Sequence, residues 1–92
     1  MEFTVEFYGM PRRLSGVPEA KVDVPPGATL RDIVAALVAM YPSFLNGLVD
    51  PVTYEINDPY FFNIDARHVP KNLDYQPKEG ERLLLLFLEA GG

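Results

Sequence analysis

The chain has 92 residues, of which 48% are hydrophobic and 12% aromatic, so we expect one small domain with a single apolar core. It contains no cysteine, which excludes disulfides, thiolate metal sites and a cysteine persulfide on this chain. The net charge of −5 disfavours nucleic-acid binding, which depends on basic side chains, and favours protein partners with basic surfaces.

Membrane insertion and secretion are not expected from the sequence. No apolar run approaches the roughly 20 residues that a membrane-spanning helix requires. Residues 1–4 lack the basic and apolar regions of a signal peptide. We therefore expect a cytoplasmic protein with no membrane partner.

The first third of the chain predicts two strands. Residues 2–8 alternate between apolar and polar side chains, with Phe3, Val5 and Phe7 on one side, which is the pattern of a half-buried strand. Glycine, serine and proline residues break the pattern up to Pro18, and alternation resumes over residues 20–24. We expect a hairpin with an irregular loop.

A helix is predicted from Leu30 to Tyr41, because apolar residues recur there at helical spacing. Thr29 is suited to cap its start, and Asp32 lies at the third helical position, as in a weaker form of the capping box. Pro42 ends the helix.

The middle of the chain has weaker patterns. Residues 43–60 contain several turn signals, with a short helix expected near residues 44–49. Residues 60–64 predict an extended segment. A tight turn at residues 65–66 should then lead into a brief strand over residues 67–69.

The last predicted strand runs from about Arg82 to Leu88 and is apolar at every position from Leu83 onward. Strands of this kind usually lie inside a sheet, so we place it beside the first strand and parallel to it, with the helix in the crossover. The expected fold is α+β, with a mixed sheet of about four to five strands packed on one main helix.

The sequence closes with Ala90, Gly91 and Gly92 directly after this strand. Glycine has no Cβ, so such a tail can pass through a channel that is too narrow for side chains. We interpret residues 1–92 as a single domain with a flexible tail at residues 89–92, and the Gly92 carboxylate as its reactive group. The alternative is that the two glycines are a frayed terminus or a cloning remnant.

Four short motifs accompany this order of elements: the helix entry Gly27-Ala28-Thr29, the turns Ile64-Asp65-Ala66 and Gly80-Glu81-Arg82, and the end Ala90-Gly91-Gly92. Together, the order and the motifs resemble the ubiquitin-like β-grasp sulfur carriers of the MoaD and ThiS families. The length and the segment at residues 43–60 are closer to MoaD. Residues 86–89 stand where molybdopterin-synthase subunits commonly have a proline-bearing segment, which leaves the pathway open.

This resemblance implies that a ubiquitin-activating-type enzyme, similar to MoeB or ThiF, adenylates Gly92 with ATP and magnesium. A sulfur donor then displaces AMP and leaves a thiocarboxylate, while Ala90 and Gly91 thread the tail into the partner. The implied pathway is molybdopterin biosynthesis for the molybdenum or tungsten cofactor, with this chain as the small, non-catalytic subunit of a synthase whose MoaE-like large subunit accepts the sulfur. We expect no bound cofactor, because the sequence has no glycine-rich phosphate loop of its own.

Side chains of the last strand should point alternately toward and away from the helix, which covers one face of the sheet. We expect Leu83, Leu85 and Phe87 to meet the helix. The other set should form an exposed apolar patch for the adenylating enzyme or the sulfur acceptor, unless residues 43–60 cover it or the protein self-associates. The residues of this predicted patch are Leu84, Leu86, Leu88 and Tyr8.

Other candidate sites are weaker. His68 is the single histidine and has no cysteine nearby, so a surface role is favoured over metal binding. No serine and histidine arrangement predicts a catalytic residue. Lys71 and Lys78 precede the last strand and are expected to be solvated rather than to contact the partner. Turns account for the aspartates Asp58, Asp65 and Asp74.

Three alternatives remain for the function. A carrier with the same tail could serve thiamine, cysteine or transfer-RNA thiolation pathways. An activated Gly92 could also form isopeptide bonds with lysines of other proteins, as a ubiquitin-like modifier does. The third alternative is a β-grasp binding module with an inert tail.

Overall fold

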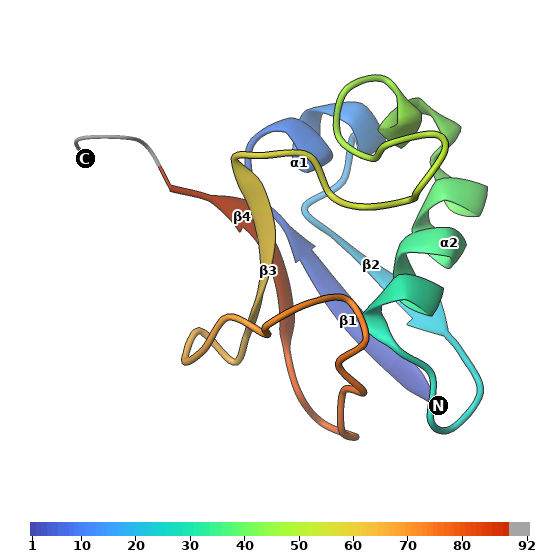
Figure 1. Cartoon of the computed structure of the whole chain (residues 1–92), viewed down its shortest axis with the longest axis vertical. Coiled ribbons are helices and arrows are strands. Elements are labelled where there is room, and N and C mark those ends of the chain that lie inside the picture. The colour runs from blue at the N-terminus through green and yellow to red at the C-terminus, as the bar shows by residue number, and fades with distance from the viewer. Residues whose placement is uncertain (89–92) are drawn as a thin grey trace.

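The computed structural model describes residues 1–88 of the chain. Figure 1 shows a sheet with its long helix on one face and a short helix near the end at which the last strand stops. In chain order the elements are β1 (Glu2–Phe7), α1 (Met10–Ser15), β2 (Glu19–Asp23), α2 (Leu30–Met40), the 3₁₀ helix η1 (Pro42–Leu45), β3 (Tyr60–Ile64) and β4 (Leu83–Phe87).

Within these residues the sheet has four strands in the order β2-β1-β4-β3. β1 pairs with β2 in antiparallel orientation and with β4 in parallel orientation, and β3 pairs antiparallel with β4. The predicted parallel placement of the last strand beside the first is therefore confirmed, as is the mixed sheet on one main helix. Neither helix in the described residues has the length and apolar content that a membrane span requires.

The core lies between the sheet and α2. It takes alternate residues from the strands and the apolar stripe of the helix, which is why the sequence patterns of period two and period 3.6 identified them. At one end, the ring of Phe7 packs edge-on against Phe44 and Tyr41, with centroid distances of 5.5 and 6.0 Å. The largest fully buried side chains are Phe7, Phe44, Leu30, Ile33, Leu37, Leu48, Ile64, Leu83, Leu85, Val5, Val22 and Val34.

The start of α2 has the predicted cap in its complete form. The backbone N–H of Asp32 donates to Thr29 Oγ1 (3.3 Å), and the backbone N–H of Thr29 donates to Asp32 Oδ2 (2.8 Å). Two backbone donors at the helix start are thereby satisfied, and the carboxylate lies at the positive end of the helix dipole.

The connection between β1 and β2 differs from the expectation of an irregular loop, because it contains the helix α1. Pro11 lies in its first turn, where a missing backbone N–H costs nothing. Gly16 ends it in the left-handed conformation, with φ of 78°. The glycines and prolines that read as loop residues are thus the start and stop signals of a short helix.

The expected strand at residues 67–69 is reduced to one bridge between Ile64 and His68. The predicted turn before it is confirmed, since Asp65 and Ala66 both have positive φ, of 56° and 58°. Residues 43–60 begin with η1 and then form a loop held by a bridge between Val49 and Ile56.

Candidate functional site

The candidate site lies where β4 ends. β4 is bonded on both sides, to β1 and to β3, and its residues Leu83 and Leu85 are fully buried in the core. The strand stops at Phe87, and the next residue, Leu88, is 72% exposed. The glycine-rich tail thus follows, in sequence, directly after a strand that is held within the sheet.

Phe87 closes this end of the sheet by packing on Tyr60 and Gly9. Its ring centroid lies 5.2 Å from that of Tyr60, and the Tyr60 hydroxyl accepts a hydrogen bond from the backbone N–H of Met10 (3.0 Å) at the start of α1. Gly9 has φ of 73° and ψ of −126°, and a Cβ added there would lie 2.6 Å from Cε1 of Phe87. Phe87 was expected to meet the main helix, but the contacts of its ring are with this glycine and tyrosine.

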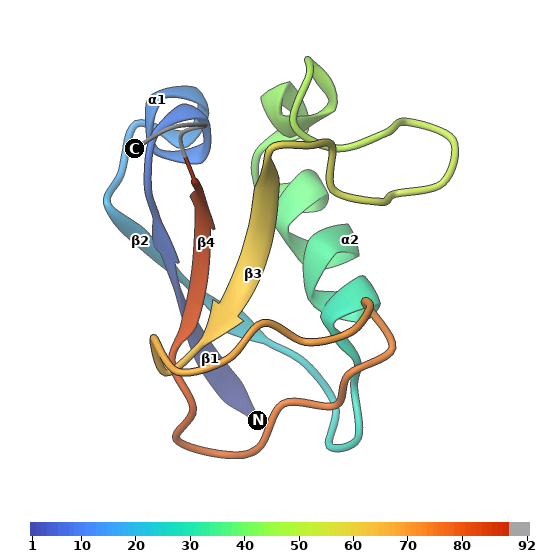
Figure 2. The same ribbon diagram turned by 60° about the vertical axis from the view of Figure 1, so that its left-hand side comes forward.

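The face of the sheet opposite α2 carries no helix in residues 1–88 (Figures 1 and 2). Near the end of β4 this face is apolar. Leu86 is paired with Phe61 of β3, and Tyr8 follows Phe7, which is paired with Leu85, so Tyr8 lies level with Leu86. Tyr8 is 41% exposed, and Leu86 and Phe61 are half-buried. We call Tyr8, Phe61, Leu86 and Leu88 the apolar end of the open face.

Leu84 does not belong to the apolar end, although we expected it in the exposed patch. It is 7% exposed and lies in the middle of the sheet, paired with Glu6 of β1 and Asn63 of β3. Central position between two flanking strands accounts for its burial, which a pattern within one strand does not reveal. Asn63 Oδ1 is also buried there, and no hydrogen-bond partner for it lies among residues 1–88.

The rest of the open face is polar and is organised by an ion pair. Arg82 binds Glu6 with two nitrogens, Nε to Oε2 (2.7 Å) and Nη2 to Oε1 (2.9 Å), and the Tyr8 hydroxyl donates to Glu6 Oε1 (2.9 Å). The hydrogen bonds from Arg82, more than the one from Tyr8, hold the pKa of Glu6 below its ordinary value. The same carboxylate raises the pKa of Tyr8. The network fixes Tyr8 at the boundary between the polar and apolar parts of the face.

The structure thus brings together three of the four residues of the predicted patch and adds Phe61, which the sequence analysis missed. The alternation of residues 60–64 contains the signal for Phe61, because it places Phe62 and Ile64 inside and Phe61 outside. The tail residues Ala90, Gly91 and Gly92 lie outside the described residues.

The remaining candidates show no arrangement for chemistry. Within residues 1–88 no cluster of three or more histidine, aspartate or glutamate side chains is arranged to hold a metal ion. His68 is exposed, with its ring edge-on to Tyr75 at 5.7 Å. Lys71 and Lys78 are exposed, as expected.

No family model and no curated relative matches the sequence. Solved structures with the same arrangement do exist. SAMP1 from Haloferax volcanii matches with a TM-score of 0.83 and 21% identity, over 100% of both chains. A Pyrococcus furiosus protein assigned as subunit 1 of the molybdopterin converting factor matches with a TM-score of 0.72 and 20% identity, over 92% of this chain and 94% of that one. Urm1 from Trypanosoma brucei matches with a TM-score of 0.74 and 19% identity, over 99% and 95%.

These matches extend over nearly the whole length of each protein, at an identity that establishes the fold. The expected architecture and its resemblance to small β-grasp proteins are therefore confirmed at the level of structure. The chain has the ubiquitin-like β-grasp fold that these solved structures share.

Proposed function

We propose that this chain is a ubiquitin-like sulfur carrier whose Gly92 carboxylate is adenylated and then converted to a thiocarboxylate. The observation that carries the proposal is a central β4, paired with β3 along its length and with β1 over its first three residues, which ends at Phe87 and is followed in sequence by residues 88–92 with their terminal glycines. A five-residue segment reaches at most about 17 Å. Gly92 can therefore enter a partner's active site while the sheet stays outside, and the small residues Ala90 and Gly91 suit a narrow channel.

A carboxylate needs activation because its charge is delocalised and its leaving group would be oxide. In the first step, an oxygen of Gly92 attacks the α-phosphorus of ATP and pyrophosphate leaves. In the second, the sulfur of a hydrosulfide-level donor attacks the acyl carbon, AMP leaves with that oxygen, and a proton is released. The chain has no cysteine, so the donor belongs to a partner.

ATP and magnesium would also belong to the adenylating partner. The sequence has no glycine-rich phosphate loop of its own, so nucleotide binding is assigned to that partner.

The apolar end of the open face is the proposed docking surface for the adenylating enzyme or the sulfur acceptor. It lies beside the last residue of β4, so a partner that covers Tyr8, Leu86 and Leu88 would also receive the tail. Aromatic and leucine side chains on one flat face are suited to a desolvated interface centre.

Two finer versions of the function differ in the fate of activated Gly92. Transfer of sulfur to the large subunit of a molybdopterin synthase is supported by the structural likeness to the Pyrococcus converting-factor subunit. Formation of isopeptide bonds with other proteins is supported by the likeness to SAMP1, a small archaeal modifier protein. Both versions require the same activated carboxyl group.

The test is the intact mass of the protein after incubation with ATP, magnesium, the adenylating enzyme from the same genome and sulfide. We expect an oxygen-to-sulfur mass shift that maps to the C-terminal peptide and is absent in a variant lacking Gly92. Adducts on lysines of other proteins would favour the modifier version. An unchanged mass with an enzyme that activates another substrate would overturn the proposal and favour a binding module.

A further inference from the structure

A slot of about 300 Å³ lies beside β3. It shares Phe61 with the apolar end of the open face, but its lining contains neither Tyr8, Leu86 nor Leu88. Figure 2 shows β3 at the edge of the sheet, with the segment after it turning back toward the start of α2. Apolar residues from a helix and two loops line the slot, among them Leu30 of α2, Ile56 before β3 and Val69 after it. Val69 is 55% exposed, so the slot opens to solvent.

The outer edge of β3 is occupied at both ends and open in the middle. The backbone N–H of Tyr60 donates to Asn57 O (3.0 Å), and that of Ile64 donates to His68 O (2.8 Å). Backbone groups of successive strand residues point to opposite edges. The N–H and C=O of Phe62 therefore point outward as well, into the slot, and no hydrogen bond to either is found among residues 1–88.

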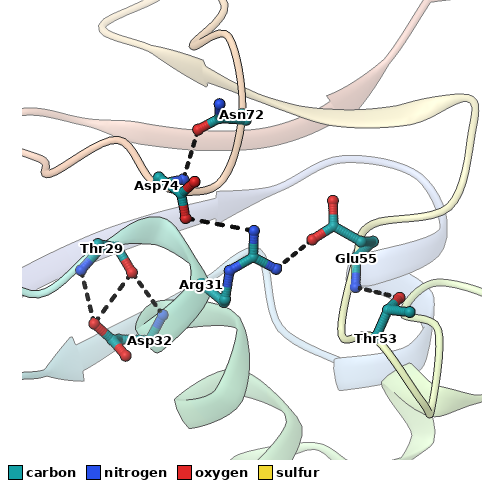
Figure 3. Close-up of polar contacts among 7 residues, drawn as sticks. All are labelled: Thr29, Arg31, Asp32, Thr53, Glu55, Asn72 and Asp74. Atoms are coloured by element: carbon teal, nitrogen blue, oxygen red, sulfur yellow. Dashed lines mark hydrogen bonds and ion pairs between the residues drawn. The ribbon is translucent and has the colours of Figure 1, made fainter.

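The walls of the slot are held in place from the start of α2 (Figure 3). Arg31 forms an ion pair with Glu55 on one wall, and it reaches Asp74 Oδ1 (3.5 Å), which directly follows the lining residue Leu73 of the other wall. The backbone N–H of Arg31 donates to Leu73 O (3.0 Å), and that of Leu30 to Tyr75 O (3.0 Å). Asn72 Oδ1 accepts from the backbone N–H of Asp74 (2.8 Å) and stiffens the same segment. The slot is preformed, because both loops are tied to one helix end.

We propose that this slot binds a short extended segment of a partner protein, which adds as a strand to the edge of β3 at Phe62. A free backbone N–H and C=O on one residue can form a pair of hydrogen bonds with the backbone of an added strand. In this mode of recognition the main-chain hydrogen bonds supply affinity, and a side-chain pocket supplies specificity. The open edge between the two occupied ends spans about four residue steps, or about 13 Å, which limits the bound segment to about three residues.

The charged residues around the slot favour one kind of partner segment. Arg31 is neutralised by Glu55 and Asp74, whereas Lys71 at the rim has no ion pair among residues 1–88. An apolar residue that fills the slot, followed by an acidic residue near Lys71, is therefore the favoured occupant. Because the chain has an overall charge of −5, the positive charge of Lys71 is a local exception, and it favours an acidic partner residue at this rim in particular.

The probe is a set of blocked tripeptides, acetyl-X-Val-Asp-amide with X as valine, isoleucine, leucine or phenylalanine, titrated into the ¹⁵N-labelled full chain. We expect saturable shifts of the Phe62 and Val69 amide signals at up to about 10 mM peptide, since two or three hydrogen bonds give millimolar affinity. A tripeptide N-methylated at valine should bind at least several-fold more weakly. Lys71→Glu should weaken binding of the aspartate peptides and favour their lysine analogues, while Lys78→Glu, in the same loop outside the slot, should change nothing.

Hydrogen exchange of the free protein gives a second readout that needs no peptide. The Phe62 amide should exchange much faster than those of its neighbours Phe61 and Asn63, which are bonded to β4. Equal protection of the three amides would show that the edge is closed and would overturn the proposal. Absence of shifts with all four peptides, or equal binding of the N-methylated peptide, would do the same. Thiocarboxylate formation at Gly92 plays no part in these readouts, so this proposal and the carrier function fail separately.

Discussion

The two halves of the apolar run in β4 have different environments despite nearly identical sequence. Leu83, Leu84 and Leu85 are buried, whereas Leu86 and Phe87 are half-buried and Leu88 is exposed. The first half has a strand on each side and α2 on one face. β1 ends at Phe7, opposite Leu85, so Leu86 and Phe87 are paired only with β3. Burial of an apolar strand residue thus depends on neighbours on both sides, and the half that lacks a β1 neighbour is the half that leads into the tail.

The largest expected effect on stability comes from a substitution in the buried half of the run. Leu85→Ala removes a fully buried side chain from the core and should cost about 2–5 kcal/mol of unfolding free energy. Leu88→Ala, in the exposed half, should change it by less than about 0.5 kcal/mol. Chemical denaturation of the two variants measures both values, and similar costs would contradict the division of the strand.

Adenylation of Gly92 should instead depend on the less buried half of the run. Leu86→Asp places a charge in the apolar end of the open face and should lower kcat/KM for adenylation of Gly92 about 30-fold, the effect of losing an interface residue that contributes about 2 kcal/mol. The fold should persist, as judged by circular dichroism. Thr4→Asp makes the same change of charge on the polar part of that face and should leave adenylation unaltered. Unchanged adenylation by Leu86→Asp would remove this surface from the account.

Gly9 tests how the half-buried end is fixed. Its backbone conformation and the 2.6 Å approach of Phe87 both disfavour a side chain, so Gly9→Ala should cost about 1–3 kcal/mol. Gly27→Ala is the matched control, because Gly27 also has positive φ, of 84°, but no atom lies within 4 Å of an added Cβ. A larger loss for Gly9→Ala, with an altered near-ultraviolet signal from Tyr60, would confirm the role of the Phe87 contact. Equal losses for the two variants would show that backbone strain alone accounts for the cost at Gly9.

The smallest expected effect concerns the polar part of the open face and depends on pH. Arg82 lowers the pKa of Glu6 from its ordinary value of 4.5, so the carboxylate form stabilises the fold above that pH. This contribution should disappear as the pH falls through the lowered pKa. The difference in unfolding free energy between the wild-type protein and Glu6→Gln should therefore be largest near neutral pH and shrink as the pH falls below 4.5. A difference independent of pH would exclude the ion pair as its cause.

The sequence was sufficient to predict the elements whose signals are local. The period of α2, its Thr29 and Asp32 cap and the alternation of β1 each depend on neighbouring residues, and each is confirmed. The parallel pairing of β4 with β1 also followed from its uniform apolarity. α1 was missed because a six-residue helix bounded by glycine and proline gives the same signals as a loop.

Features that depend on distant segments were not predictable from the sequence. Leu84 is buried by its position between Glu6 and Asn63, which only the strand order brings level. The slot beside β3 depends on two loops that Arg31 holds to the start of α2, and no motif marks that meeting of segments. The role of Gly92 stays a prediction, made from residue type alone, since the tail lies outside the described residues.

The most direct test of the functional end is an amide footprint of the ¹⁵N-labelled chain bound to its adenylating enzyme with ATP and magnesium. We expect loss of signal or new protection at Tyr8, Phe61, Leu86 and Leu88, with little change at β2 and at the loop that carries Lys78. A footprint on that loop and β2, with the apolar end of the open face unaffected, would contradict the account.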